Sequence, residues 1–263
     1  MRNRMIRSAV AVAGILCAAG IAAGAQATDI DTFINTNGGY TYIDPATGSI
    51  NGTIHFAGNE GGEGAAVGRI LLTGVDASNN AVSMPVYCID VADWLAPGVF
   101  TKQALSSLSF TTAQQTAIVK FITYGDAQVN AASGFTKTLL SAATQLGVWE
   151  ILNEAPSTSW NVLSGTFSAS AYGSDTTILS AAAQANSWLN LLTANTLPTI
   201  PGQTLSVLNP GGGNQSQVYI TARGGDDNIE LGVPEPATWG MIVVGFGLLG
   251  AALRRRKPEE LFA

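Results

Sequence analysis

Short runs of apolar and β-branched residues open the body of the chain, and turn-forming residues separate each run from the next. This pattern is typical of half-buried strands. The runs cover residues 39–43, 49–56, 69–75 and 82–89. Between two of them, the glycine-rich segment 58–64 contains Glu60 and Glu63 and is not followed by Lys-Ser or Lys-Thr. We therefore interpret it as a flexible hairpin loop and not as a phosphate-binding loop.

From residue 111 onward, apolar residues recur at the spacing of helices. Thr112 and Gln115 have the spacing of a capping box, and Gly125 is a candidate for the residue that ends this first helix after about three turns. Two more helices are expected, one from Ser133 or Thr136 to a point before Pro156 and one over residues 176–194.

Strand-like runs return at residues 204–208 and 217–222, joined by a glycine turn at 211–213. The order of strands, helices and strands predicts an α+β fold. We expect an antiparallel β-sheet, sandwich-like domain over residues 28–232, with an inserted bundle of about three helices. A doubly wound α/β fold is disfavoured because it would alternate strands with helices.

The first 27 residues have the pattern of a secretory signal peptide. Three arginines precede an apolar run at residues 9–23, and small residues suit cleavage after Ala27. A retained membrane anchor is the alternative. Lipoprotein processing at Cys17 is disfavoured because the preceding Leu16 is bulky.

The C-terminal end carries a second targeting pattern. A proline-glutamate-proline motif precedes the apolar run 239–253, and an arginine cluster follows that run. The motif residues are Pro234, Glu235 and Pro236, and the cluster contains Arg254, Arg255 and Arg256. The run is slightly short for a transmembrane segment, which needs roughly 17 to 25 residues. The basic cluster would keep the tail, residues 258–263, cytoplasmic.

Residues 233–257 resemble the PEP-CTERM sorting signal of Gram-negative bacteria. The resemblance implies that an exosortase processes the protein after export through the inner membrane. It also implies a final location at the cell surface or in the extracellular matrix. A permanent tail anchor is the alternative.

Charge limits the partners of the body between the two signals. Residues 28–232 contain five basic and fifteen acidic side chains, a net charge of −10. Nucleic acids and anionic lipid surfaces are therefore poor partners, because phosphate binding needs a face of lysines and arginines. We expect membrane contact only through the C-terminal segment, and we predict no cofactor.

Cys88 is the only cysteine left once the signal peptide is removed. In an exported protein, an unpaired thiol indicates either an intermolecular partner or chemistry of its own. Gln145 lies on the second expected helix and shares a face with Val148, Trp149 and Leu152. We expect its amide to be buried. A buried amide needs hydrogen bonds or a covalent partner, because leaving it unpaired costs a few kcal/mol.

The segments Tyr87-Cys88-Ile89-Asp90 and Thr144-Gln145-Leu146-Gly147-Val148-Trp149 resemble the paired signature of bacterial surface thioester domains. That resemblance implies an intramolecular thioester between Cys88 and Gln145, with Tyr87, Asp90, Thr144 and Trp149 around it. It further implies a single-turnover covalent binder, not an enzyme. The binder would capture an amine or hydroxyl on a partner protein or polysaccharide. Because known members carry Gram-positive wall-sorting signals, attachment to host cells does not follow.

Other interpretations remain open. Cys88 would be structural in a matrix protein that binds carbohydrate without covalent capture. A cysteine hydrolase would need Cys88, the only histidine, His55, and an acid such as Asp90. Calcium binding by Asp226 and Asp227, or by residues 60–63, lacks a regular ligand spacing. Zinc is not expected with one cysteine and one histidine, so we predict no metal site.

Overall fold

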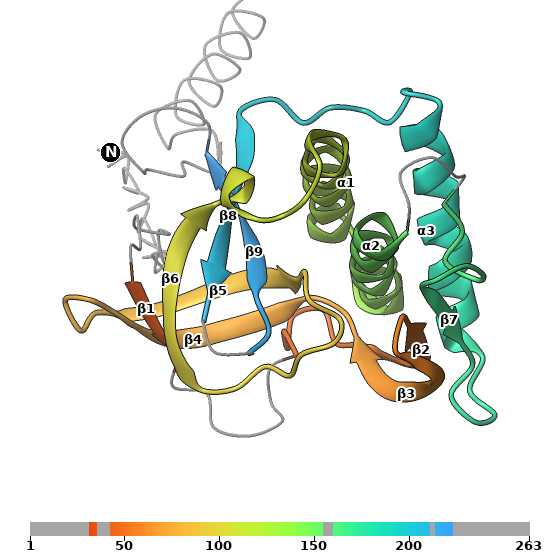
Figure 1. Cartoon of the computed structure of the whole chain (residues 1–263), viewed down its shortest axis with the longest axis horizontal. Helices are drawn as coiled ribbons and strands as arrows, with labels where there is room; N and C mark the ends of the chain where they lie inside the picture. Colours follow the sequence, from red (N-terminus) through yellow and green to blue (C-terminus); the bar gives the residue numbers. More distant parts are fainter. Residues whose placement is uncertain (1–31, 36–42, 155–159, 211–213, 223–263) are drawn as a thin grey trace, which may run out of the picture.

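Six antiparallel strands close into a barrel, and helices and a smaller sheet pack beside it (Figure 1). The structure is a computed structural model, and it describes residues 32–35, 43–154, 160–210 and 214–222. The barrel strands are β1 (Thr32–Asn35), β4 (Ile70–Asp76), β5 (Ala81–Cys88), β6 (Gly98–Ala104), β8 (Gln203–Asn209) and β9 (Gln217–Ala222). The second sheet contains β2 (Ile50–Phe56), β3 (Asn59–Val67) and β7 (Ser168–Ser170). The helices are α1 (Thr112–Ala131), α2 (Gly134–Asn153) and α3 (Thr177–Thr193), with a short 3-10 helix, η1 (Leu105–Ser107).

The barrel has the strand order β1-β4-β5-β9-β8-β6, and β1 pairs with both β4 and β6 to close it. Phe33 of β1 and Phe100 of β6 are directly opposite in the register, and their ring centroids lie 6.2 Å apart in the core. Aromatic pairs at this separation stabilise a core beyond the area they bury. The N-terminal and middle segments of the chain are thereby joined on one side of the barrel.

Helix α2 is the centre of the rest of the molecule. It packs against α1, α3, β5 and the small sheet, and in Figure 1 it lies between the other two helices. Every residue from Ser141 to Ile151 is buried. The buried stretch includes the polar residues Thr144, Gln145 and Glu150, and buried polar side chains need partners inside the protein.

Small residues let α1 approach α2 closely. A Cβ atom at Gly125 of α1 would lie 2.5 Å from Oγ1 of Thr144, and one at Gly147 of α2 would overlap the ring of Phe121. Neither site has room for a methyl group without movement of the neighbour. The glycines therefore set the distance between α1 and α2. That distance in turn fixes where the polar side chains of α2 meet β5.

The α+β fold with antiparallel sheets and three helices among the described residues is confirmed, but the sandwich-like arrangement is wrong. Closure depends on β1 and β6, which the hydrophobic pattern did not reveal. Strand β1 is four residues long, and β6 exposes Val99 while burying Phe100. The short strand β7 was also not predicted.

Two local predictions are wrong as well. The segment 58–64 is not a flexible loop, because most of it belongs to β3 and pairs with β2. Gly125 does not end α1, which continues to Ala131. The capping box is also displaced by one residue, since Thr111 is the N-cap and Gln114 closes the box. The second and third helices and the last two strands lie where the pattern placed them.

The predicted signal peptide (1–27), the sorting signal (233–257) with its apolar run (239–253), and the tail (258–263) lie outside the described residues. Within the described residues, none of the helices combines the length and apolar character needed to cross a bilayer.

Candidate functional site

Cys88 is the last residue of β5, between the barrel and α2. Its neighbour across the ladder is Gln217 of β9, and only 1% of Cys88 is exposed. The thiol donates a hydrogen bond to the carbonyl oxygen of Asp90, at 2.9 Å from Sγ. Burial raises the pKa of the thiol well above its usual value, because the interior disfavours the thiolate. The thiol is therefore protonated and shielded from water in this state.

Gln145 bridges both polar groups of the Cys88 backbone. The Cys88 N–H donates to Oε1 of Gln145 at 2.9 Å, and Nε2 of Gln145 donates to the Cys88 carbonyl at 2.8 Å. The glutamine side chain is 1% exposed, as its position on α2 predicts. Two hydrogen bonds fix the plane of the amide, so Gln145 meets Cys88 in one defined orientation.

Tyr87 anchors the other face of β5 through a buried ionic network. Its hydroxyl donates to Oδ1 of Asp126 on α1 at 3.0 Å. Arg69 donates to the same atom at 2.9 Å and pairs with Asp44 at 2.8 Å. Asn130 also bonds both Arg69 and Asp126. Because the network links Arg69, just before β4, to β5 and α1, it holds the strand end that carries Cys88 against the helices.

Thr144 and Trp149 flank Gln145 on α2. Thr144 donates to the Leu140 carbonyl at 2.8 Å and packs against Gly125, so it contributes to the packing of α2 on α1. Trp149 is 6% exposed, and its ring lies 6.1 Å from that of Phe167. Its buried indole N–H makes no hydrogen bond of ordinary geometry.

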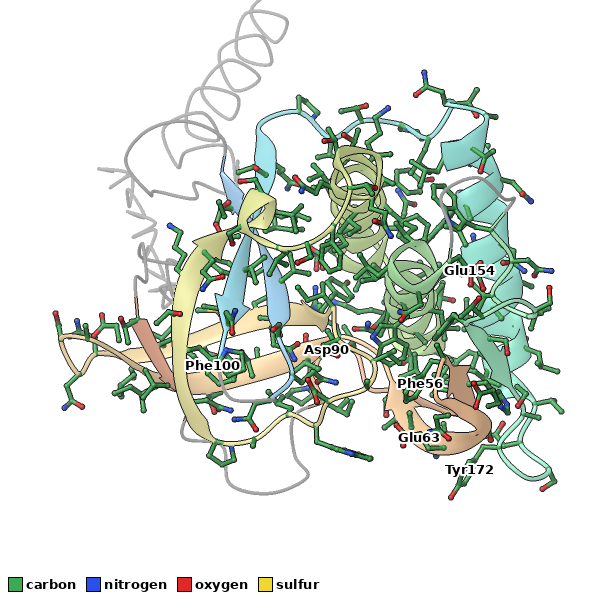
Figure 2. All side chains as sticks on the ribbon, viewed as in Figure 1. Phe56, Glu63, Asp90, Phe100, Glu154 and Tyr172 are labelled. Carbon is green, nitrogen blue, oxygen red and sulfur yellow. The ribbon has the colours of Figure 1, made fainter. Side chains whose placement is uncertain are left out.

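Asp90 lies in the loop that follows Cys88, and Figure 2 labels it between the barrel and the small sheet. Partial burial and the neighbouring Asp93 both raise the pKa of its carboxyl. The side chain of Gln215 holds this loop by donating to the carbonyls of Asp90 at 3.0 Å and Asp93 at 2.9 Å. The Gln215 side chain thus fixes the same Asp90 carbonyl that accepts the hydrogen bond of the Cys88 thiol.

Gln215 and Gln217 are site residues that the sequence did not reveal. Nε2 of Gln217 donates to Oε1 of Gln215 at 3.0 Å, while the buried Oε1 of Gln217 has no hydrogen-bond partner. Two glutamines two residues apart at the start of a strand are the only available signal, and that spacing is common on any strand face. Their importance comes from the pairing of β9 with β5, which is not local in sequence.

The structure does not bring His55 to Cys88. His55 lies on β2 in the other sheet, and its ring nitrogens bond the Glu60 carbonyl at 3.1 Å and the Ser170 hydroxyl at 3.0 Å. Both nitrogens thus have partners other than Cys88, which removes the base that a cysteine hydrolase would use. No group of three metal-ligating side chains is found among the described residues, including residues 60–63. Asp226 and Asp227 lie outside them.

Comparison with known proteins identifies the C-terminal signal. Residues 232–257 match the PEP-CTERM protein-sorting motif, which confirms the predicted signal and implies processing by an exosortase. The motif indicates an exported protein of the cell surface. No curated protein sequence matches the chain.

Three chains among solved structures match. Two are N-terminal thioester domains of a surface protein from Clostridium perfringens. One of them, a cysteine-to-alanine variant, has 12% identity and a TM-score of 0.37, and the match covers 59% of this chain and 88% of that one. The other has 12% identity and a TM-score of 0.35, covering 57% and 87%. Likeness at this level does not assign chemistry to individual atoms, so function has to rest on the geometry of Cys88 and Gln145.

Proposed function

We propose that Cys88 and Gln145 form an intramolecular thioester with which this exported surface protein covalently captures a nucleophile on a partner. The observation that carries the proposal is the double hydrogen bond between the Gln145 amide and the Cys88 backbone, in a site where both residues are 1% exposed. A glutamine held only for structure would be expected to meet backbone groups anywhere in the core. Here it meets those of Cys88, the one cysteine among the described residues.

The thioester would form by attack of the thiol on the amide. In the forming step, Sγ of Cys88 bonds to Cδ of Gln145, the bond from Cδ to Nε2 breaks, and the thiol proton leaves with the nitrogen as ammonia. The Cys88 N–H already donates to Oε1 and can stabilise negative charge that develops on that oxygen. Burial keeps water away, so the acyl group is stored and not hydrolysed.

Capture is the second step. An amine or hydroxyl attacks Cδ of Gln145, an amide or ester bond forms, and the bond to Sγ breaks with return of a proton to the thiol. The protein is consumed in one turnover, which makes it a covalent binder and not an enzyme. With the sorting motif, this suits adhesion or attachment to the extracellular matrix after exosortase processing.

Intact mass tests the proposal. The wild type should be lighter by one ammonia than its residues require, while a Cys88→Ala variant should have the mass of its residues. The difference between the two masses does not depend on where the termini are processed. A difference that equals the substitution alone would disprove the thioester. A Cys88→Ala variant should also form no adduct with methylamine.

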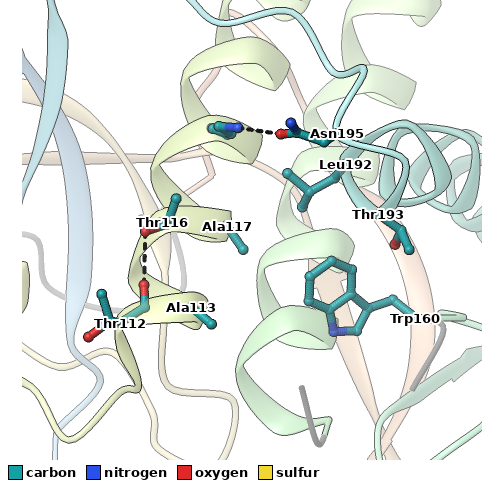
Figure 3. A pocket seen from close by; sticks show the side chains of 9 residues that line it. Thr112, Ala113, Thr116, Ala117, Trp160, Leu192, Thr193 and Asn195 are labelled. Carbon is teal, nitrogen blue, oxygen red and sulfur yellow. Dashed lines mark hydrogen bonds between the residues drawn. The ribbon is translucent and has the colours of Figure 1, made fainter. Parts of the chain in front are cut away.

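A second candidate function is carbohydrate binding without covalent capture, and a groove between α1 and α3 favours it (Figure 3). The groove has a volume of about 450 Å³ and combines one aromatic ring with hydroxyl, amide and ammonium groups. Trp160 supplies the ring, Thr116 and Thr193 the hydroxyls, and Lys120 bonds Asn195 at 2.9 Å. Stacking on an indole with polar groups beside it is suited to a neutral sugar.

Oligosaccharide binding by the Cys88→Ala variant distinguishes the two functions. Binding that survives Cys88→Ala and is lost in Trp160→Ala would support the groove. Adduct formation that is lost in Cys88→Ala and retained in Trp160→Ala would support the thioester.

A further inference from the structure

Gln217 carries a buried hydrogen-bond acceptor that no described residue satisfies. The residue lies at the start of β9 and is fully buried. Its Nε2 donates to Oε1 of Gln215 at 3.0 Å, but its own Oε1 has no partner among the described residues. An unpaired amide oxygen inside a protein costs free energy, so it needs a reason.

The hydrogen bonds of Gln215 fix which end of the Gln217 amide is unpaired. Nε2 of Gln215 donates to the backbone carbonyls of Asp90 and Asp93, which can only accept. Oε1 of Gln215 therefore faces Gln217, and only the nitrogen of Gln217 can donate to it. Turning the Gln217 amide over would place two oxygens against each other. The unpaired atom is thus the oxygen of Gln217 and not its nitrogen.

This amide lies beside the Cys88 side chain. Cys88 and Gln217 are directly opposite in the ladder of β5 and β9. The N–H of the next residue, Ile89, donates to the Ser216 carbonyl at 3.1 Å, whereas the backbone of Cys88 bonds Gln145 on its other edge. Cys88 and Gln217 therefore form a non-hydrogen-bonded pair. The side chains of such a pair point to one face of the sheet, with Cβ atoms about 4.5–5.5 Å apart.

The donors already present around Cys88 are all directed elsewhere. The thiol donates to the Asp90 carbonyl at 2.9 Å, and Nε2 of Gln215 donates to the same oxygen at 3.0 Å. Nε2 of Gln145 donates to the Cys88 carbonyl at 2.8 Å. The oxygen of Gln217 therefore needs a donor from outside, and in the proposed reaction the nucleophile is the group that brings one.

We propose that Oε1 of Gln217 accepts a hydrogen bond from the nucleophile as it attacks the thioester, an inference that rests on the proposed function. The amine nitrogen bonds to Cδ of Gln145 and becomes positively charged, while the electron pair of the breaking bond goes to Sγ of Cys88. One amine N–H donates to Gln217, and the proton that the amine loses protonates the sulfur. The hydrogen bond to Gln217 strengthens as charge develops on the nitrogen, because hydrogen bonds from ionised groups are stronger.

This contact gives the site a selectivity between classes of nucleophile. An amine or a hydroxyl brings an N–H or O–H to Gln217, whereas a thiol loses its proton before it attacks as a thiolate. A buried polar group that is left unpaired by one reactant and paired by another discriminates strongly between them. Gln217 therefore favours capture of amines and hydroxyls on a partner over reaction with small thiols.

The test compares Gln217→Met with Gln203→Met in the exported full chain. The Oε1 atom of Gln203 is also buried without a partner, but this residue lies opposite Ala222, at the far end of the ladder of β8 and β9. The rate of methylamine adduct formation, followed by intact mass, should fall about 10- to 100-fold in Gln217→Met and stay within about twofold of wild type in Gln203→Met. The rate with methanethiol should change less than about threefold in both variants.

Two results would overturn the role of Gln217. One is an equal methylamine rate in wild type and Gln217→Met. The other is a fall of the same size with methylamine and methanethiol, because it would indicate a disturbed site and not a lost contact to the amine. Retention of ammonia by the wild type would instead overturn the proposed function, so the two failures are distinguishable by mass.

Gln217→Glu is a second variant that keeps the shape of the side chain, should Gln217→Met fail to fold. Burial favours the protonated carboxyl, which can donate to Oε1 of Gln215 while its other oxygen remains an acceptor. Its methylamine rate should therefore stay within about threefold of wild type. A fall as large as that expected for Gln217→Met would contradict the inference, because the acceptor is still present.

Discussion

The amide of Gln145 satisfies the N–H and the carbonyl of Cys88 together, at 2.9 and 2.8 Å. The two residues are 57 apart in the chain, so the contact exists only because α2 is packed against the end of β5. One side chain thus provides a structural link between helix and barrel and also the acyl group of the proposed reaction.

Gln145→Ala should lower stability strongly. Made in a Cys88→Ala background, where the amide is retained, the substitution leaves the N–H and carbonyl of residue 88 unpaired and creates a cavity, so we expect a loss of about 2–4 kcal/mol in the free energy of unfolding by urea. Gln115→Ala, which removes a single bond from Nε2 to the Phe110 carbonyl, is the matched control and should cost about 1 kcal/mol. Similar losses in the two variants would contradict the central role of the Gln145 contact.

Gly147→Ala should destabilise the protein although alanine favours helices by about 1 kcal/mol over glycine. The added methyl overlaps the Phe121 ring, and overpacking of this kind typically costs about 1–3 kcal/mol. Because α2 must move, ammonia loss should also decrease. A compensating Phe121→Leu change should recover part of both properties, as measured by thermal unfolding and intact mass. No recovery in the double variant would mean that the Phe121 contact is not the cause.

Arg69→Leu should cost about 3–5 kcal/mol, because Asp44 and Asp126 would remain buried without their counter-charge. Urea unfolding measures the loss. Neutralising the two acids by Asp44→Asn and Asp126→Asn in the same chain should restore part of it. Lys120→Ala, at the edge of the groove, is the control and should change stability by less than about 1 kcal/mol. An Arg69 variant as stable as this control would contradict the prediction.

Glu150 should make the protein less stable as the pH rises from about 4.5 to about 7. Burial raises the pKa of its carboxyl to about 7, helped by the charge of Glu154 and opposed by the Asn161 N–H. A carboxyl with a raised folded-state pKa binds protons more tightly in the folded state, so its ionisation at higher pH destabilises the fold. Urea unfolding at pH 5 and pH 8 should differ by roughly 1–3 kcal/mol from this group.

Glu150→Gln should remove that pH dependence and stabilise the protein at pH 8 relative to wild type. Glu63→Gln, on the half-exposed β3, is the control and should leave the dependence in place. If the slope between pH 5 and pH 8 is the same in Glu150→Gln as in wild type, another group is responsible.

Local sequence patterns predicted the parts of the site that a single helix or strand positions. The spacing of Gln145 and Trp149 on a helix, and the place of Cys88 at the end of a strand, follow from periodicity. The contacts from Gln215, Gln217 and Asp126 do not, because they require the pairing of β5 with β9 and the packing of α1 on α2. No periodicity within a segment specifies which distant segment it meets.

The glycines of segment 58–64 give a second example of a feature that local sequence did not predict. The segment 58–64 was predicted to be a loop because it is rich in glycine, which is common in turns. In the structure, Gly62 and Gly64 lie in β3 where the rings of His55 and Tyr172 cover them, and a Cβ at Gly64 would be 2.6 Å from the Tyr172 ring. The missing side chains make room for aromatic groups from β2 and from the segment after β7. Composition alone does not distinguish that use of glycine from flexibility.

The register that sets Cys88 opposite Gln217 has a consequence for the order of events in export. Strand β9 is the last described strand to leave the membrane if the chain crosses from its N-terminus, and the walls around the thiol are incomplete until it pairs with β5. A partly translocated chain therefore has no dry compartment in which an acyl bond survives. On the proposed function, the thioester therefore forms only after the barrel has closed, and the protein does not react with other molecules during its own export.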